Sequence, residues 1–338
     1  MRIGFVVNEI NTERGGYTTT CLARAACRLG HETYHMGVGD FSLRPDDRAY
    51  ALARTLPSRD YATGDDFLAQ LRDKNNPPQR ICLNDLDVLL LRNDANDDAL
   101  ERPWARMAGI NFGFLAQRAG VLVLNKPETL ARSLTKLYLQ YFSETIRPKT
   151  LITRDQSEAL EYIDDMDGHA VLKPLFGSGG RNVFLVRPSD RPNLHQMMDV
   201  ICREEGYMIV QEYLPAARNG DIRLFMVNGQ PLQMNGKIAA IHRIPNVKIG
   251  DMRSNMTAGG TSHEAKITEQ ILNIAETVGP KLKEDGVFLA GLDIVGDKVL
   301  EVNVLSPGGF VSAEKFCGVS FSEKVIELLE EKVRENGH

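Results

Sequence analysis

Three oxygen-bearing side chains lie in two otherwise apolar runs near the end of the chain. Asp293 precedes the turn signal Gly296-Asp297, and Glu301 and Asn303 follow it. Glycine and aspartate between apolar runs predict a strand, a tight turn and a second strand. Burying a carboxylate or an amide without a partner costs several kcal/mol, so these side chains need compensation. Oxygen ligands of this kind suit Mg²⁺ or Mn²⁺, and the alternative is an antiparallel hairpin with an acidic, solvent-exposed face.

The length of the turn decides whether the three side chains meet. A two-residue loop pairs Asp293 with Leu300 and places Asp293 on the face opposite Glu301. A three-residue loop, 296–298, pairs Asp293 with Glu301, and Asn303 then shares their face because side chains alternate along a strand. We expect the three-residue loop, because the lysines and glycines described next indicate a polyphosphate, and a polyphosphate requires a cation.

A lysine and a glycine-rich connection lie in the middle of the chain. Lys173 stands within an apolar run, where a cation requires an anion, and Gly177, Ser178, Gly179 and Gly180 follow shortly afterwards. Glycines allow backbone N–H groups to approach phosphate oxygens. No Gly-Lys-Ser/Thr follows, so this is not a Walker loop. We expect a flexible flap that closes over a triphosphate, and the alternative is a glycine hairpin without a ligand.

Later segments carry further polar residues that could complete a nucleotide site. An expected strand, 207–214, ends in polar residues whose backbone could face the edge of a base. Asp221 and Arg223 share one face of the next expected strand, where a structural salt bridge is the alternative reading of Arg223. Residues 242–264 are polar, basic and glycine-rich without a clear period. Long segments of this kind are typically lids or binding loops.

The composition sets limits on the class of protein. With 338 residues, 43% of them hydrophobic, the chain should form two or three domains. A net charge of −5 argues against a nucleic-acid partner. Five scattered cysteines favour a reducing cytoplasm over a disulfide framework or a zinc site. The first apolar run is too short for a signal peptide or a membrane span, so we expect a cytoplasmic protein without a membrane partner.

The order of expected elements indicates an α/β fold. The first 125 residues alternate strands and helices, which predicts a parallel sheet with right-handed crossovers. Gly15 and Gly16 follow the first strand but form no G-x-G-x-x-G, which excludes a dinucleotide fingerprint and a Rossmann dehydrogenase. A helix over 129–143 carries Lys136, for which a solvated charge is the ordinary reading. The remaining expected strands are 2–8, 32–36, 87–91, 121–124, 148–153, 170–175 and 221–227, and the remaining helices are 18–29, 104–119, 155–163, 194–204, 267–284 and 320–334.

A series of short motifs along nearly the whole chain resembles those of the ATP-grasp ligases and, within them, the bacterial glutathione synthetases. Their number and order, rather than any single motif, carry the resemblance. The motifs are 85–88, 125–127, 135–137, 172–175, 177–180, 211–215, 220–223, 243–245, 253–255, 258–260, 291–294 and 301–304. The resemblance implies an N-terminal Rossmann-like parallel-sheet domain (1–125) followed by a two-part ATP-grasp fold, with a central lid subdomain (126–205) and a catalytic subdomain (206–338).

The resemblance also implies roles for individual residues. Lys136 and Lys173 would contact ATP phosphates beneath the glycine flap, and Asp221 would lie near the ribose. The adenine would lie against the strand end formed by Gln211, Glu212, Tyr213 and Leu214. Asp293, Glu301 and Asn303 would hold two Mg²⁺ ions. Arg223, Arg243 and Asn255 would lie where the acyl phosphate meets the acceptor, and Arg253, Ser306, Gly308 and Gly309 would contact the substrate.

The implied reaction joins a carboxylate to an amine in two steps. The carboxylate attacks the γ-phosphate of ATP to give an acylphosphate and ADP, and an amine then displaces phosphate through a tetrahedral state that Arg223 could stabilise. Water would destroy the acylphosphate, so a lid is required, and residues 242–260 are our candidate. The resemblance further implies small-molecule peptide and amino-acid substrates and a homo-oligomer, a dimer or a tetramer.

Two departures from the family pattern fall on the substrate side. Gly308 and Gly309 stand where the relatives carry a threonine and a charged stretch, and 92–96 lacks an Asp-Pro-Pro. The resemblance implies that this chain makes glutathione, with γ-glutamylcysteine, glycine and ATP as its expected substrates. The alternatives are a ligase for another peptide or amino acid, similar to enzymes that add glutamate to protein or cofactor ends, and a non-catalytic nucleotide-binding module. Such a module should lack a metal ligand or a phosphate lysine, and this chain has all of them.

Overall fold

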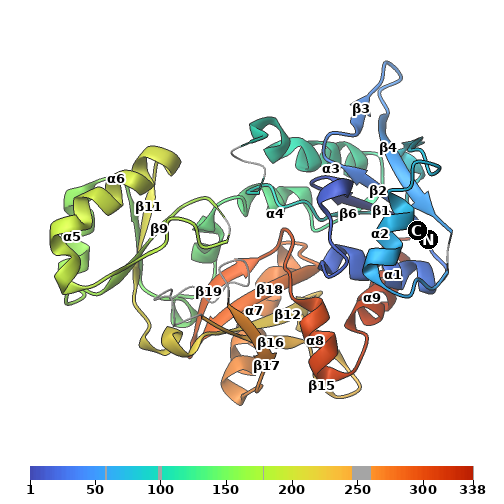
Figure 1. Cartoon of the computed structure of the whole chain (residues 1–338). Coiled ribbons are helices and arrows are strands. Elements are labelled where there is room, and N and C mark those ends of the chain that lie inside the picture. Colours follow the sequence, from blue (N-terminus) through green and yellow to red (C-terminus); the bar gives the residue numbers. More distant parts are fainter. Residues whose placement is uncertain (58, 98–100, 178, 246–259, 338) are drawn as a thin grey trace.

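Three large β-sheets, a two-stranded sheet and the surrounding helices form the described part of the molecule (Figure 1). The computed structural model describes residues 1–57, 59–97, 101–177, 179–245 and 260–337. In the described residues, no helix is both long enough and apolar enough to cross a membrane. Both chain ends lie together beside the N-terminal sheet, far from the central sheet (Figure 1).

The N-terminal sheet is mixed, not wholly parallel as expected. Its parallel part consists of β1 (Arg2–Val7), β2 (Glu32–Gly37), β6 (Val88–Leu91) and β7 (Leu122–Leu124). The strands β3 (Phe41–Leu43), β4 (Ala49–Leu56) and β5 (Gln79–Cys82) add an antiparallel extension. The sequence reading missed β3, β4 and β5. Ala49, Ala51 and Ala53 of β4 are buried on one face, but such small side chains give a weak alternation of hydrophobicity.

Helices cover the N-terminal sheet. They are α1 (Thr18–Arg28), α2 (Gly64–Leu71) and α3 (Ala108–Arg118), and the 3₁₀ turn η3 (Pro103–Met107) precedes α3. The single helix expected over 104–119 therefore begins as a 3₁₀ turn. The other expected elements of this part are confirmed within a few residues.

The central sheet projects to one side of the molecule (Figure 1). Its strands run in the order β10 (Phe184–Val186), β9 (Ala170–Pro174), β11 (Met208–Glu212) and β8 (Thr150–Thr153). The helices α5 (Gln156–Asp164) and α6 (Leu194–Glu205) pack against it around a separate core that includes Leu172, Met198 and Val210. β11 pairs with β8 and β9 of the central sheet. The expected subdomain boundary at 205/206 would place β11 in the C-terminal subdomain, and that boundary stays a prediction.

The C-terminal sheet has its strands in the order β17 (Thr261–Glu264), β16 (Ala240–Ile244), β12 (Asp221–Val227), β18 (Leu289–Val295) and β19 (Lys298–Asn303). Short strands β13 (Gln230–Pro231), β14 (Gln233–Met234) and β15 (Lys237–Ile238) lie between β12 and β16. The helices are α7 (Glu269–Glu284), α8 (Phe310–Cys317) and α9 (Phe321–Glu335). The segment expected to be a structureless loop thus begins and ends in paired strands, because Ile244 lies opposite Thr261. Residues 246–259 of the candidate lid lie outside the described residues.

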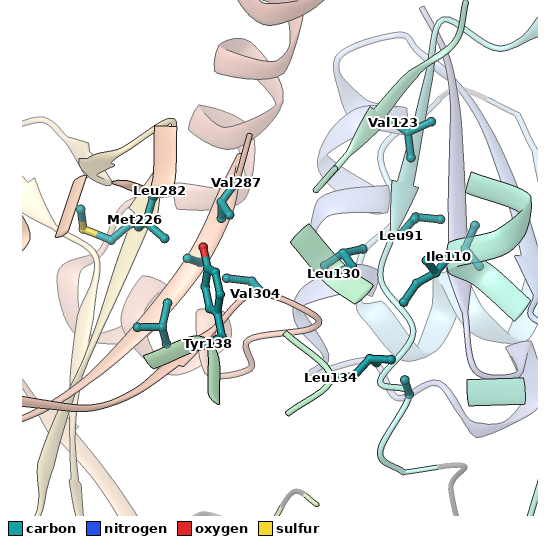
Figure 2. Close-up of a cluster of buried hydrophobic side chains, with 14 of the residues drawn as sticks. Leu91, Ile110, Val123, Leu130, Leu134, Tyr138, Met226, Leu282, Val287 and Val304 are labelled. Atoms are coloured by element: carbon teal, nitrogen blue, oxygen red, sulfur yellow. The ribbon is translucent and has the colours of Figure 1, made fainter. Parts of the chain in front are cut away.

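Two hydrophobic clusters contain residues of both the N-terminal and the C-terminal sheet, and the larger one is shown in Figure 2. Leu91, Ile110 and Val123 lie on the first side, and Met226, Leu282 and Val287 lie on the second (Figure 2). Leu130 and Leu134 lie toward the first side, and Tyr138 lies on the second side beside Val304 (Figure 2). The site residues of both sheets are therefore held on one packed body.

The single helix expected over 129–143 is wrong. Two helices lie there instead, α4 (Pro127–Arg132) and the 3₁₀ helix η4 (Lys136–Tyr141). The Ser133 hydroxyl donates to the Thr129 carbonyl at 2.7 Å. The backbone N–H of Lys136 donates to the Leu175 carbonyl at 2.9 Å instead of continuing the helix. The break therefore joins Lys136 to the end of β9.

Candidate active site

The β18–β19 hairpin reaches the expected pairing by a different route. Val295 lies opposite Lys298, so the turn has two residues and the expected three-residue loop is wrong. The register then shifts between Asp293 and Ile294, and Asp293 lies opposite Glu301 as expected. Leu300 is the extra residue of a β-bulge, which moves the later side chains of β19 to the other face. The bulge thus brings Asp293, Glu301 and Asn303 to one face of the hairpin.

Asp293 is buried within a group of arginine side chains. Its carboxylate accepts from Arg223 Nε at 2.5 Å and from Arg223 Nη2 at 2.8 Å. Arg243 Nη2 lies 2.8 Å from the same carboxylate, and Asn303 Nδ2 donates to it at 3.2 Å. Burial alone would raise the pKa of Asp293, but the two guanidinium groups lower it to about 2. Asp293 is therefore a fixed negative charge at neutral pH.

A second carboxylate completes this group. Asp221 lies opposite Arg243 in the β12–β16 ladder and accepts from Arg243 Nε at 2.7 Å. Two buried arginines thus face two buried aspartates across three adjacent strands. Buried charges need partners of this kind. The contacts of Arg223 are those of a structural ion pair, which was the alternative reading of this residue.

The expected metal ligands differ in how free their oxygens are. In the part of the chain that the structure describes, no three histidine, cysteine, aspartate or glutamate residues are grouped to hold a metal. The Glu301 carboxylate is 40% exposed and 4.0 Å from Lys136 Nζ. Asp293 already accepts from two arginines, so it would have to share its oxygens with a cation. Glu301 and Asn303 fit a hard cation best by donor chemistry, and the ligand set stays a prediction.

The cavity between the central and C-terminal sheets has a volume of about 410 Å³. It brings together most of the residues expected to bind ATP. These are Lys136, Lys173, Gly177, Gly179, Gly180, Gln211, Glu212, Tyr213, Leu214 and Asp221, with Arg243, Asp293 and Glu301 of the C-terminal sheet. Ser178 lies outside the described residues. A smaller chamber of about 80 Å³ adjoins this cavity and shares Lys136, Lys173 and Glu301 with it.

Both expected phosphate lysines face this space from different elements. Lys136 Nζ donates to the Gly177 carbonyl at 2.5 Å, at the start of the glycine-rich loop. Lys173 Nζ donates to Gln211 Oε1 at 2.9 Å. Burial lowers the pKa of Lys173 to about 8, with Glu301 opposing this effect and Lys136 adding to it.

The predicted phosphate contact of Lys173 would make nucleotide affinity dependent on pH. Its ammonium is present below pH 8 and is lost above it, so a phosphate contact should weaken as the pH rises. We expect the Kd of an ATP analogue to rise by up to about tenfold per pH unit above pH 8. Titrations at pH 7, 8 and 9 measure this. The K173R variant, which stays charged, should lack the rise, and a pH-independent wild-type Kd would contradict the phosphate role.

The substrate-side residues lie around the smaller chamber or near it. Ser306 lines the chamber with Asn303. The Gly308 carbonyl accepts from Arg223 Nη1 at 3.3 Å. Gly309 precedes α8, a helix that the sequence reading missed, and has φ +112°. Arg223 does not line either space, and Arg253 and Asn255 lie outside the described residues.

The two glycines should respond differently to substitution. A Cβ on Gly309 would meet Ile241 Cδ1 at 2.7 Å, whereas a Cβ on Gly308 would meet nothing within 4 Å. Gly309→Ala should therefore lower the free energy of unfolding by about 1–3 kcal/mol. The matched Gly308→Ala control should change it by no more than about 0.5 kcal/mol. Urea unfolding measures both, and equal losses would contradict the backbone requirement at Gly309.

Two residues that follow the N-terminal sheet join the site; their segment, 92–96, was expected on the substrate side, but neither residue was named as a site residue. Asp94 and Asn96 follow β6 and line the smaller chamber. Burial raises the pKa of Asp94 to about 6, and the nearby carboxylates of Asp97 and Glu301 add to the shift. The signal was available, because the carboxyl ends of parallel strands commonly form binding sites. Asn8, after β1, holds Asp94 through bonds of 2.7 and 2.8 Å to its backbone.

Comparisons with known proteins agree along the whole chain. The family model of the prokaryotic glutathione synthetase N-terminal domain matches residues 1–131, and that of the prokaryotic glutathione synthetase ATP-grasp domain matches 135–318. A glutathione synthetase of Agrobacterium fabrum is 34% identical over 321 residues, covering 94% of this chain and 92% of its own. The Escherichia coli K12 glutathione synthetase is 32% identical over 342 residues, covering 99% of each chain.

A solved structure supports the fold. The RimK domain ATP-grasp protein of Sphaerobacter thermophilus superposes with a TM-score of 0.59 at 18% identity. The match covers 97% of this chain and 98% of that one. At this identity the likeness concerns the fold alone.

Proposed function

The chain belongs to the prokaryotic glutathione synthetase family, whose members are ATP-dependent ligases, and we propose that it joins γ-glutamylcysteine to glycine. The observation that carries this proposal is the joint cavity. Two lysines, a glycine-rich loop and the acidic hairpin reach it from different elements. Such a site can neutralise a triphosphate without a nucleophilic side chain.

ATP would lie between the central and C-terminal sheets. Residues 211–214 would hold the adenine, and Asp221 would lie near the ribose. Lys136, Lys173 and the loop at 177–180 would contact the phosphates. The support for this placement is that the described members of this set line one cavity of about 410 Å³.

Magnesium would be held at the acidic hairpin. Glu301 and Asn303 would supply oxygens, and Asp293 would share its carboxylate between the cation and its arginines. Two ions are expected from the family resemblance. When bound, Mg²⁺ would neutralise charge on the phosphate oxygens.

The reaction would take place where the two spaces meet. The cysteinyl carboxylate attacks the γ-phosphate, the bond to the β-phosphate oxygen breaks, and an acylphosphate and ADP form. The glycine amine then attacks the acyl carbon and phosphate leaves. Arg243 lines the cavity and would stabilise the developing charge. Arg223, which faces Asp293 and the Gly308 carbonyl, would act by positioning these groups rather than by direct contact.

The narrow chamber supports a small acceptor. Its volume of about 80 Å³ and its mixed lining of polar and aliphatic side chains suit an amino acid without a bulky side chain. The positive φ of Gly309 explains why glycine stands there, whereas Gly308, where the relatives carry the threonine, has no positive φ and open space around a Cβ. The missing threonine hydroxyl at Gly308 is therefore the departure that bears on the acceptor, and the substrate screen below tests it. We further propose a cytoplasmic homo-oligomer, a dimer or a tetramer.

An ADP-release screen tests the substrates. γ-Glutamylcysteine and other dipeptides are each paired with each amino acid in the presence of ATP and Mg²⁺. We expect the fastest release with γ-glutamylcysteine and glycine together, and little with either alone. No stimulation by this pair would overturn the substrate assignment, and stimulation by another pair would identify the true substrates.

A further inference from the structure

An arginine of the N-terminal part lies against the start of the glycine-rich loop. Arg106, in η3, places its Cζ 4.0 Å from the ring centroid of Phe176. Within the described residues, its Nε and Nη2 atoms are buried and have no hydrogen-bond partner. Arg106 therefore contributes stacking here rather than a network of hydrogen bonds.

Phe176 directly precedes the part of the loop that faces the lysines. The next residue, Gly177, accepts from Lys136 Nζ, and Leu175 accepts from the backbone N–H of Lys136. Gly177 has φ +99°, so the chain turns sharply directly after Phe176. The start of the loop is thus in contact with both η4 and Arg106.

This contact joins parts of the molecule that have separate cores. The central sheet packs around its own cluster, whereas η3 precedes α3, whose Ile110 lies in the core shared by the other two sheets. A stacked contact across such a boundary can fix the position of the loop relative to the rest of the site. The two unpaired nitrogen atoms of Arg106 carry a desolvation cost that opposes the stacking.

We propose that Arg106 is a positioning residue that fixes the start of the glycine-rich loop, Phe176 and Gly177, beside the nucleotide cavity through its stack on Phe176. The inference rests on the proposed function, in which the loop covers the ATP phosphates. A planar guanidinium stacks on an aromatic face in a way that a lysine ammonium does not reproduce. The role is therefore specific to the Arg–Phe pair and does not depend on charge alone.

The test uses Arg106→Lys, Phe176→Leu and the double variant, with Arg118→Lys as the matched control. Arg118 is an exposed arginine at the end of α3. Each single variant should raise the KM for ATP by about tenfold with a smaller change in kcat, and the double variant should be no worse than either. Wild-type KM values in both single variants, or additive losses in the double variant, would overturn the proposal.

A second readout does not depend on the substrates. Arg181 is an exposed tryptic site within the same loop, so its cleavage rate reports how often the loop opens. In the nucleotide-free protein, both single variants should be cut after Arg181 about tenfold faster than wild type and Arg118→Lys. Equal cleavage rates would refute the stack as a restraint. Failure of the wild type to bind ATP would refute the proposed function instead, since the cleavage comparison needs no nucleotide.

Discussion

Replacing Glu301 with glutamine should lower ligase turnover by about 100-fold or more while the fold persists. Glu301 is the best-placed carboxylate for a cation, because its side chain is 40% exposed and lines both spaces of the site. Glutamine keeps the shape and removes the negative charge. ADP release at saturating substrates measures the effect, and a thermal melt checks the fold.

Glu327→Gln is the matched control for this substitution. Glu327 lies on α9 and pairs with Lys324 at 3.1 Å on the helix surface. Its loss should leave turnover unchanged and cost at most about 1 kcal/mol of stability. Wild-type ADP release by Glu301→Gln would show that the metal assignment is wrong.

Replacing Asp293 with asparagine should lower the free energy of unfolding by about 3–5 kcal/mol. The substitution removes the carboxylate that Arg223 and Arg243 share, and both guanidinium groups then stay buried with one negative charge fewer. Urea unfolding of Asp221→Asn provides the comparison. In that variant Arg223 keeps its partner, so the loss should be smaller. Equal losses would contradict the view that Asp293 is the centre of the group.

The same carboxylate sets a pH dependence of stability. Because the folded-state pKa of Asp293 is lowered to about 2, its contribution is fully present above about pH 4. It is lost as the pH falls from about 4 through about 2, and amounts to roughly 2–3 kcal/mol. Unfolding at pH 6 and pH 3 should show a steeper loss for wild type than for Asp293→Asn. Parallel losses in the two proteins would contradict this contribution.

The sequence analysis predicted correctly that Asp293 lies opposite Glu301, but it predicted the wrong length for the turn between the two strands. Asp293 lies opposite Glu301 because of a bulge at Leu300, not because of a three-residue turn. Both arrangements satisfy the same alternation of apolar residues. A bulge shifts register without changing composition, so hydrophobic periodicity cannot distinguish the two.

Other differences arise from tertiary contacts that no local pattern contains. The helix expected over 129–143 breaks because the N–H of Lys136 bonds to Leu175, a residue of another element. The arginine partners of Asp293 come from strands 50–70 residues earlier in the chain. Lys173, the glycine-rich loop and the strand end at 211–214 were predicted together, because glycines and a lysine in an apolar run are strong local signals.

The central claim is that a substrate carboxylate attacks ATP in this cavity, and an oxygen-transfer experiment tests it most directly. The enzyme is incubated with ATP, Mg²⁺, glycine and γ-glutamylcysteine carrying ¹⁸O in its cysteinyl carboxylate. An acylphosphate passes one carboxylate oxygen to phosphate when the amine displaces it. We predict one ¹⁸O atom in each phosphate released with peptide product, and unlabelled phosphate released with that product would contradict the account.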